Sequence, residues 1–274
     1  MTWKASSGWS GINAEKRNNF FKTSGYLYEE PVNLLMQEFR SIHTYHTVLE
    51  VCASGANKVN EIADKAHIST ATLSYVLRGL TEIGILSRRS PMTEKENRRK
   101  TSYEISDGMY RFWYCFVPSA RASIEMERGE VFYHRYVKEK LHNYMGGIFE
   151  EMCRQYTLTQ GLDGKLNCLV TNVGSWWGSG QDHKPTDIDV VGIDDVSKKA
   201  VIGECKFRNE VIDKEVYDSL MNRRGLIDRH YEEAEYLFFS LSGFSKWVME
   251  NAQSDSVRLL TLKDLYPEEH EIRQ

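Results

Sequence analysis

The spacing of apolar residues changes once along this chain, near Gly146, and that change limits the folds open to it. Before Gly146, apolar residues recur every three or four positions, which is typical of amphipathic helices. After it, short apolar runs such as DIDVVGI and AVIGECKF alternate with helical segments, which is typical of a sheet flanked by helices. The 274 residues therefore predict two domains of different class, without internal repeats.

The composition favours a folded protein of a reducing cytoplasm. Hydrophobic residues make up 41% of the chain and charged residues 27%, close to globular averages. No apolar stretch approaches the roughly 20 residues that span a bilayer, and the first ten residues lack the apolar core of a secretion signal. The five cysteines are scattered without a C-x-x-C pair, which favours free thiols. We expect a cytoplasmic protein without membrane association, and the oligomeric state stays open.

Residues 27–108 predict a winged helix-turn-helix domain. Its first helix contains EEPVNLLMQEF, and three short apolar helical patterns then fill residues 41–84. Ser69 can cap the last of these helices. Two strand-like runs, ILSRRSP and TSYEI, follow around a basic loop. This order of elements is typical of a winged helix.

Three other segments complete the expected organisation. Residues 1–26 are expected to form a polar lead-in that turns helical near Phe20, and residues 109–145 an aromatic helical connector. Residues 146–274 are expected to form a mixed sheet flanked by helices. Its elements are expected to be a helix at 146–156, strands at LNCLVTNV, DIDVVGI and AVIGECKF, a helix from about Val211 to Arg229, strand EYLFFS, helix 244–253 and strand VRLLTL.

The two halves of the chain carry opposite charge. Residues 1–140 hold 20 Lys and Arg against 16 Asp and Glu, whereas residues 141–274 hold 15 against 23. The winged helix adds candidate phosphate contacts on its third helix and wing: Thr70, Thr72, Arg78, Arg88, Arg89, Arg98, Arg99 and Lys100. DNA is therefore the expected partner, with RNA left open. Winged helices also serve as protein-interaction modules, and one arginine on the third helix gives little sequence-specific readout.

An acidic pattern in the second half carries the main chemical signal. Asp187 and Asp189 share one face of a strand, and Glu204 and Lys206 share one face of the next, because side chains two apart point the same way. If the two strands form a hairpin, Asp189 and Glu204 converge beside the lysine. Such a pair suits Mg²⁺ or Mn²⁺, which prefer oxygen ligands and activate water. The predicted chemistry is metal-assisted phosphodiester hydrolysis.

Plainer explanations compete with this site. Each acidic pair alone is more often a surface ion pair on a solvated strand. Cys205 is expected to point into the opposite packing layer as a buried thiol rather than a nucleophile. No histidines stand at zinc-binding spacing.

The combination of motifs resembles a known family. GGIFEEMCRQY (146–156), VGSWWG (173–178), TDIDVVGID (186–194) and IGECKFRNE (202–210) are similar to the carboxy-terminal domain of a predicted archaeal and bacterial ATPase family, a domain like the PD-(D/E)xK nucleases. The preceding winged helix and YEISDGMYRFWYCFV (103–117) match that family too. The resemblance covers roughly residues 25–266 and implies a restriction-endonuclease-like mixed sheet after a winged helix.

The resemblance also implies functional residues. It makes Glu150 the first acidic residue, Asp189 and Glu204 the metal ligands for Mg²⁺ or Mn²⁺, and Lys206 the catalytic lysine; the adjacent Glu151 is expected to be solvated, because neighbours on a helix cannot both face the site. The family often has an arginine where Ser175 stands and a glutamate where Asp187 stands, so a supporting charge is weakened at the first of these positions.

The resemblance leaves the role of the whole chain open. The family's proteins normally begin with a P-loop ATPase, and this chain has no G-x-x-x-x-G-K-[ST] sequence. No nucleotide is therefore expected to bind, and an ATPase domain or subunit in trans is a candidate partner. The alternatives to a nuclease are a non-catalytic regulatory or interaction module of an ATPase and a winged-helix transcriptional regulator.

Overall fold

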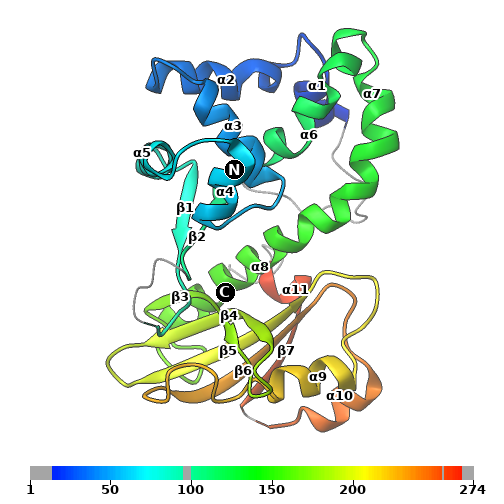
Figure 1. Cartoon of the computed structure of the whole chain (residues 1–274). Coiled ribbons are helices and arrows are strands. Elements are labelled where there is room, and N and C mark those ends of the chain that lie inside the picture. Colours follow the sequence, from blue (N-terminus) through cyan, green and yellow to red (C-terminus); the bar gives the residue numbers. More distant parts are fainter. Residues whose placement is uncertain (1–13, 95–99, 255, 267–274) are drawn as a thin grey trace. The chain divides into compact units, whose positions relative to one another are not determined.

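The computed structural model describes residues 14–94, 100–254 and 256–266. The chain divides into two compact units, one of residues 1–89 and 101–141, the other of residues 90–100 and 142–274. Helices and strands occur in both units, so the protein belongs to the mixed α and β class (Figure 1). None of the described helices combines the length and the apolar character that crossing a bilayer requires.

The first unit consists of helices around a small two-stranded sheet. Strands β1 and β2 pair antiparallel from Leu86–Ile105 to Arg89–Ser102. The elements are α1 (Ala14–Phe21), α2 (Tyr26–Glu38), α3 (His43–Ala53), α4 (Val59–Ala66), α5 (Thr70–Glu82), β1 (Leu86–Arg89), β2 (Ser102–Ile105), α6 (Gly108–Glu125), α7 (Gly129–Phe132) and the π-helical segment η1 (Tyr133–Val137).

Helices α3, α4 and α5 followed by the β1–β2 hairpin form the winged-helix arrangement that the sequence predicts. The α4–α5 turn places His67 in the left-handed region, and the Ser69 hydroxyl accepts a hydrogen bond from the Thr72 N–H at 3.1 Å. This hydroxyl satisfies one of the backbone donors that a helix start leaves unpaired. Leu49 of α3, Ile62 of α4 and Leu73 of α5 are fully buried.

The aromatic segment after the wing is part of this unit's core rather than a separate connector. Helix α6 buries Phe112, Trp113 and Tyr114, and the Trp113 indole N–H donates to the Tyr28 carbonyl at 2.8 Å. The Phe20 ring of α1 lies 4.6 Å from the Phe112 ring between centroids. The expected lead-in is therefore packed structure from α1 onward, and residues 1–13 lie outside the described residues.

The second unit is built on one five-stranded mixed sheet in the order β3-β4-β5-β6-β7. Strands β3, β4 and β5 pair antiparallel, and β6 and β7 run parallel to β5. The elements are α8 (Lys138–Leu162), which begins before the unit boundary, β3 (Asn172–Ser179), β4 (Pro185–Asp194), β5 (Lys199–Lys206), α9 (Lys214–Met221), β6 (Glu232–Ser240), α10 (Lys246–Asn251), β7 (Val257–Thr261) and α11 (Leu262–Leu265).

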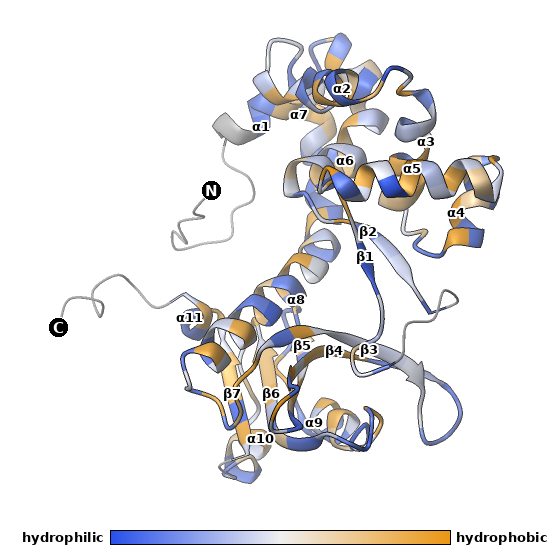
Figure 2. Ribbon diagram, turned by 90° about the vertical axis from the view of Figure 1, so that its left-hand side faces the viewer, coloured by the Kyte–Doolittle hydropathy of each residue, from blue (hydrophilic) through white to orange (hydrophobic). Residues whose placement is uncertain are grey.

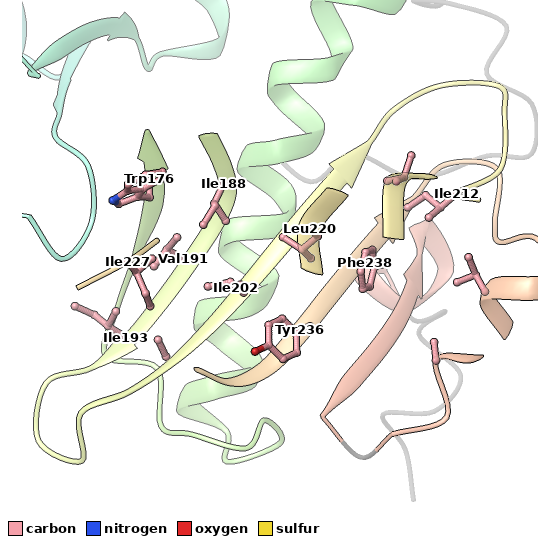
Figure 3. Packing of buried hydrophobic residues seen from close by; sticks show 14 residues of the cluster. Trp176, Ile188, Val191, Ile193, Ile202, Ile212, Leu220, Ile227, Tyr236 and Phe238 are labelled. Atoms are coloured by element: carbon pink, nitrogen blue, oxygen red, sulfur yellow. The ribbon is translucent and has the colours of Figure 1, made fainter. Parts of the chain in front are cut away.

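Apolar side chains cover both faces of this sheet. On one face, Leu220 of α9 packs with Ile202 and Phe238 of the sheet (Figure 3). Val248 of α10 belongs to the same cluster. On the other face, Phe149 of α8 belongs to a second cluster that includes Val190, Val201, Cys205 and Phe239. The hydropathy colouring shows hydrophobic residues along much of β5 and β6 (Figure 2). Strands buried on both faces explain the nearly continuous apolar runs in the sequence.

Two element predictions for the second unit were wrong in extent. LNCLVTNV is largely irregular, and the strand begins only at Asn172, so that VGSWWG forms β3. The expected long helix from Val211 to Arg229 is reduced to α9, which ends at Met221. The sequence signal was ambiguous because Leu166, Cys168 and Val170 are buried without belonging to a strand. Short apolar runs do not distinguish a strand from a buried loop.

Candidate functional site

The predicted acidic residues lie where the pairing between β4 and β5 ends. The last paired residues are Val190 and Gly203. Beyond that pair, the Asp189 carboxylate accepts a hydrogen bond from the Cys205 backbone N–H at 2.8 Å. A side chain thus takes the place of a ladder acceptor, and the two strands bring Asp189 next to Glu204.

Glu204 is a carboxylate buried at the centre of the sheet. Its side chain is 3% exposed, and each of its two oxygens has a cationic partner. Lys206 pairs with Oε1, and Arg223 Nη1 lies 2.5 Å from Oε2. A buried carboxylate needs charged partners, because an unpaired one destabilises the fold by on the order of several kcal/mol.

Helix α8 adds a second group of charges to the site. Arg154 is buried; it donates to the Asp189 carbonyl at 3.0 Å and lies 3.7 Å from Glu150 Oε2. Its guanidinium also binds Glu151 through two hydrogen bonds of 3.0 and 3.2 Å. The expectation that Glu151 is merely solvated was therefore wrong, because Arg154 is one helical turn away and reaches both acids.

Three carboxyl groups crowd one another here. The pKa of Asp189 is raised to about 7, first by burial, then by the charges of Glu204 and Glu150. The Cys205 N–H and the Lys206 ammonium oppose this rise without cancelling it. A carboxyl group with such a pKa is a place where added positive charge is favourable.

The donor set fits a hard divalent cation better than zinc. Within residues 14–94, 100–254 and 256–266, no group of three or more His, Cys, Asp and Glu side chains is arranged to hold a metal ion. Two carboxylates, Asp189 and Glu204, are nevertheless enough for Mg²⁺, which is commonly held by one or two carboxylates with water and substrate phosphate completing its shell. The crowding of carboxyl groups at Asp189 supports the fit of a divalent cation to this site.

The Cys205 thiol, next to Glu204 in the sequence, is buried. Cys205 belongs to the apolar cluster under α8, with Cys153 and Phe149. Burial, followed by the neighbouring Cys153, raises the pKa of the Cys205 thiol. A thiol with a raised pKa is a poor nucleophile, which agrees with the expectation of a buried structural cysteine.

The candidate nucleic-acid residues of α5 reach solvent. Thr70, Thr72 and Arg78 are exposed, while Leu73 and Val76 are buried. Tyr75 is 62% exposed, and the Arg78 guanidinium lies over its ring at 5.8 Å from the centroid. A flat pair of this kind offers a cation and an aromatic surface on the same side of the helix.

The wing residues are more heavily paired than the sequence suggests. Arg89 pairs with Glu104 across the hairpin, and Lys100 pairs with Glu94. Arg88 is exposed on β1. Arg98 and Arg99 lie outside the described residues.

Part of the loop between the wing strands packs in the second unit. The Met92 N–H donates to the Ser175 carbonyl at 2.9 Å, and the Thr93 hydroxyl accepts from the Asp228 N–H at 3.1 Å. The Trp177 indole N–H donates to the Lys100 carbonyl at 3.1 Å. Trp176 is buried in the adjacent core. These contacts leave less of the loop available for phosphate than its four positive charges, at positions 95, 98, 99 and 100, imply.

Two arginines of the site were missed in the sequence. Arg154 lies four residues after Glu150, and this helical spacing is a signal that could have been used. Arg223 follows α9, at a distance of 19 residues from Glu204 in the sequence. Its contact with Glu204 depends on the tertiary fold alone, and no local sequence pattern predicts it.

Comparisons with known proteins cover the same residues. A family model described as archaeal and bacterial proteins of unknown function matches residues 113–218, a range that includes Glu150, Asp189, Glu204 and Lys206. An uncharacterized protein of Methanocaldococcus jannaschii is 25% identical over 242 residues, which are 82% of this chain and 53% of that protein. The chain thus spans about half the length of this curated relative.

Solved structures resemble the chain only loosely. A MarR family regulator from Neisseria meningitidis is 16% identical, with 48% of this chain and 87% of that chain covered and a TM-score of 0.25. A zinc-responsive MarR family member from Lactococcus lactis is 15% identical, with 46% and 96% covered and a TM-score of 0.26. These scores are too low to support an argument, so the winged-helix description rests on the elements of this chain.

The crowded carboxyl predicts a pH dependence of stability. The folded chain keeps the Asp189 proton up to about pH 7, whereas an ordinary aspartate loses it near 3.8. The folded state therefore binds more protons, so the free energy of unfolding falls as pH rises from about 4 to about 7, by on the order of 2–4 kcal/mol. Asp189→Asn keeps an acceptor for the Cys205 N–H and should remove this fall. The measurement is urea denaturation across pH in a chelating buffer.

The matched control for this prediction is Asp187→Asn, on the same strand and exposed. It should retain the wild-type pH dependence. An Asp189→Asn variant that loses stability with pH as steeply as the wild type would contradict the assignment of the effect to Asp189.

Proposed function

We propose that the chain binds nucleic acid with its winged helix and hydrolyses phosphodiester bonds at the Asp189–Glu204 site with a divalent cation. The single observation that carries the proposal is the convergence of these two carboxylates at the end of the β4–β5 pairing, with Lys206 on Glu204. The PD-(D/E)xK resemblance of the sequence supports the same reaction class. DNA is the preferred substrate in this proposal, and an ATPase in trans is its candidate partner.

The residues of the site would have different roles in this reaction. Asp189 and Glu204 would hold Mg²⁺ or Mn²⁺, which supplies an activated water and polarises a phosphoryl oxygen when bound. Lys206 places a compact positive charge beside that position, where it can stabilise charge developing on the phosphate. Arg154 fixes the Asp189 backbone and holds Glu150 near the site, because its guanidinium contacts both.

The winged helix would bind the nucleic-acid strand. Thr70, Thr72 and Arg78 are exposed on α5, and Arg88 is exposed on β1. Hydroxyl and guanidinium groups of this kind mostly contact phosphate and sugar, which position a protein without reading sequence. The proposal therefore includes little base specificity.

A second candidate is a non-catalytic scaffold that regulates or binds another protein. One observation favours it: Lys206 and Arg223 together neutralise Glu204 without a metal ion. A nuclease fold that had lost its reaction would keep such an ion-paired carboxylate for stability.

Metal binding and cleavage distinguish the two candidates. Asp189→Ala and Glu204→Ala should each weaken Mn²⁺ binding, which calorimetry measures. Both variants should also abolish cleavage of single- or double-stranded DNA or RNA. Lys206→Ala should not weaken Mn²⁺ binding and should lower the cleavage rate about 10²–10³-fold, the range found on removing one charge-stabilising donor. Asp187→Asn serves as the control with wild-type behaviour.

Wild-type protein that binds no Mn²⁺ at millimolar concentration would contradict the enzyme proposal. If the wild type instead binds the ion with Asp189 and Glu204 and cleaves nothing, the missing factor to test next is an ATPase added in trans.

The DNA-binding part makes its own prediction. The double variant Arg78→Ala/Arg88→Ala should weaken duplex binding for all sequences and lower the slope of log K against log salt by about 1 per lost phosphate contact. Fluorescence anisotropy at several salt concentrations measures both quantities. Arg121→Ala is the matched control, because Arg121 is exposed on α6 and pairs with Glu125. Equal binding by the double variant and the control would assign the winged helix to a protein partner.

A further inference from the structure

Arg223, the second cation bound to Glu204, suggests a role that Lys206 does not have. We propose that Arg223 is a positioning residue that holds the Glu204 carboxylate until a divalent cation takes it, and that then binds a phosphate oxygen of the substrate strand. The inference rests on the proposed function of the Asp189–Glu204 site and deepens it. The phosphate that Arg223 would bind lies beside the scissile bond.

The charges of the site point to an exchange of partners. Without a metal ion, four acidic side chains, Asp189, Glu204, Glu150 and Glu151, lie with three basic ones, Lys206, Arg223 and Arg154, within the second unit. A divalent cation on Glu204 would add two positive charges directly beside Lys206 and Arg223, which already occupy both of its oxygens. Like charges held a few ångströms apart repel strongly at partial burial, so one basic group gains by leaving the carboxylate. A phosphate diester brings the negative charge that the displaced group needs.

Arg223 is the basic group placed to leave. Lys206 is part of β5, where its backbone pairs with Ser240 and its carbonyl accepts the Leu241 N–H at 3.1 Å. Arg154 is buried and bound to the Asp189 carbonyl. Both cations on Glu204 reach solvent, with side-chain exposures of 20% for Arg223 and 29% for Lys206, but only Arg223 offers a planar guanidinium, the group suited to a phosphate.

The turn that carries Arg223 is fixed, which leaves the side chain as the moving part. Gly225 has a φ of +73°, a conformation that glycine adopts readily, and its N–H donates to Glu233 at 2.8 Å. The guanidinium of the adjacent Arg224 lies over the Tyr236 ring at 5.1 Å. A planar guanidinium on such an anchored turn can donate its N–H groups to a carboxylate or to a phosphate.

The test compares cation affinity and strand affinity in the full-length chain. Mn²⁺ binding is measured by calorimetry for the wild type, Arg223→Gln, Arg223→Lys and the control Arg224→Gln. Arg223→Gln should bind Mn²⁺ about tenfold more tightly than the wild type, because a competing charge is gone. Arg223→Lys should stay near the wild type, and so should Arg224→Gln.

Strand binding should change in the opposite direction. With Ca²⁺ as the ion and a DNA duplex as the probe, Arg223→Gln should bind more weakly, with the salt slope lower by about 0.9 for one lost phosphate contact. Arg224→Gln should keep the wild-type slope. A variant that gains ion affinity and loses strand affinity cannot be explained by damage to the fold, which would lower both.

A measurement on the wild type covers the case in which Arg223→Gln does not fold. Phenylglyoxal modifies accessible arginines, and mass spectrometry of the peptide containing Arg223 reports its reactivity with and without Mn²⁺. The proposal expects Mn²⁺ to raise this reactivity and a DNA duplex to lower it again. Unchanged reactivity in ion-saturated protein overturns the role of Arg223.

The outcomes separate this inference from the proposed function. Ion binding by the wild type with equal or weaker binding by folded Arg223→Gln overturns the role of Arg223 and leaves the metal site standing. Ion binding by Arg223→Gln alone supports the exchange. An absence of binding in both proteins overturns the proposed function itself.

Discussion

The ion-paired carboxylate of Glu204 is the constraint on which the second unit depends. A charge in the middle of a sheet is tolerated only when cations and hydrogen bonds replace the water it has lost. Here Lys206 and Arg223 supply the cations, one from the same strand and one from the turn after α9. The sheet, the helix α9 and its following turn therefore have to fold together for Glu204 to be buried. This shared requirement explains how residues distant in sequence reach one site.

The end of the β4–β5 ladder gives the site its location. Up to Val190 and Gly203 the strands pair through their backbones, and past that point Asp189 uses its side chain to bind the Cys205 N–H. The core continues past this point, because Cys205 and Val190 remain packed under α8. Burial of Asp189 there, followed by the charges of Glu204 and Glu150, raises its pKa.

Local patterns predicted much of this architecture. Apolar spacing located the helices α3 to α5, and alternation in DIDVVGI and AVIGECKF located β4 and β5 and the shared face of Glu204 and Lys206. The failures have physical reasons. The buried run from Leu166 to Val170 is a loop, and the aromatic α6 packs into the first unit, since burial alone does not reveal what a segment is packed against. Arg223 reaches Glu204 only through tertiary structure.

The central claim is that Asp189 and Glu204 together form a divalent-cation site. Anomalous diffraction from crystals soaked in Mn²⁺ tests it most directly, because the ion's position is seen without reference to any activity. The account predicts one strong anomalous peak with carboxylate oxygens of both residues in its coordination shell, and no peak there in Glu204→Gln crystals. Mn²⁺ bound elsewhere on the protein, with Glu204 still held by Lys206 and Arg223 at saturating ion, would contradict it.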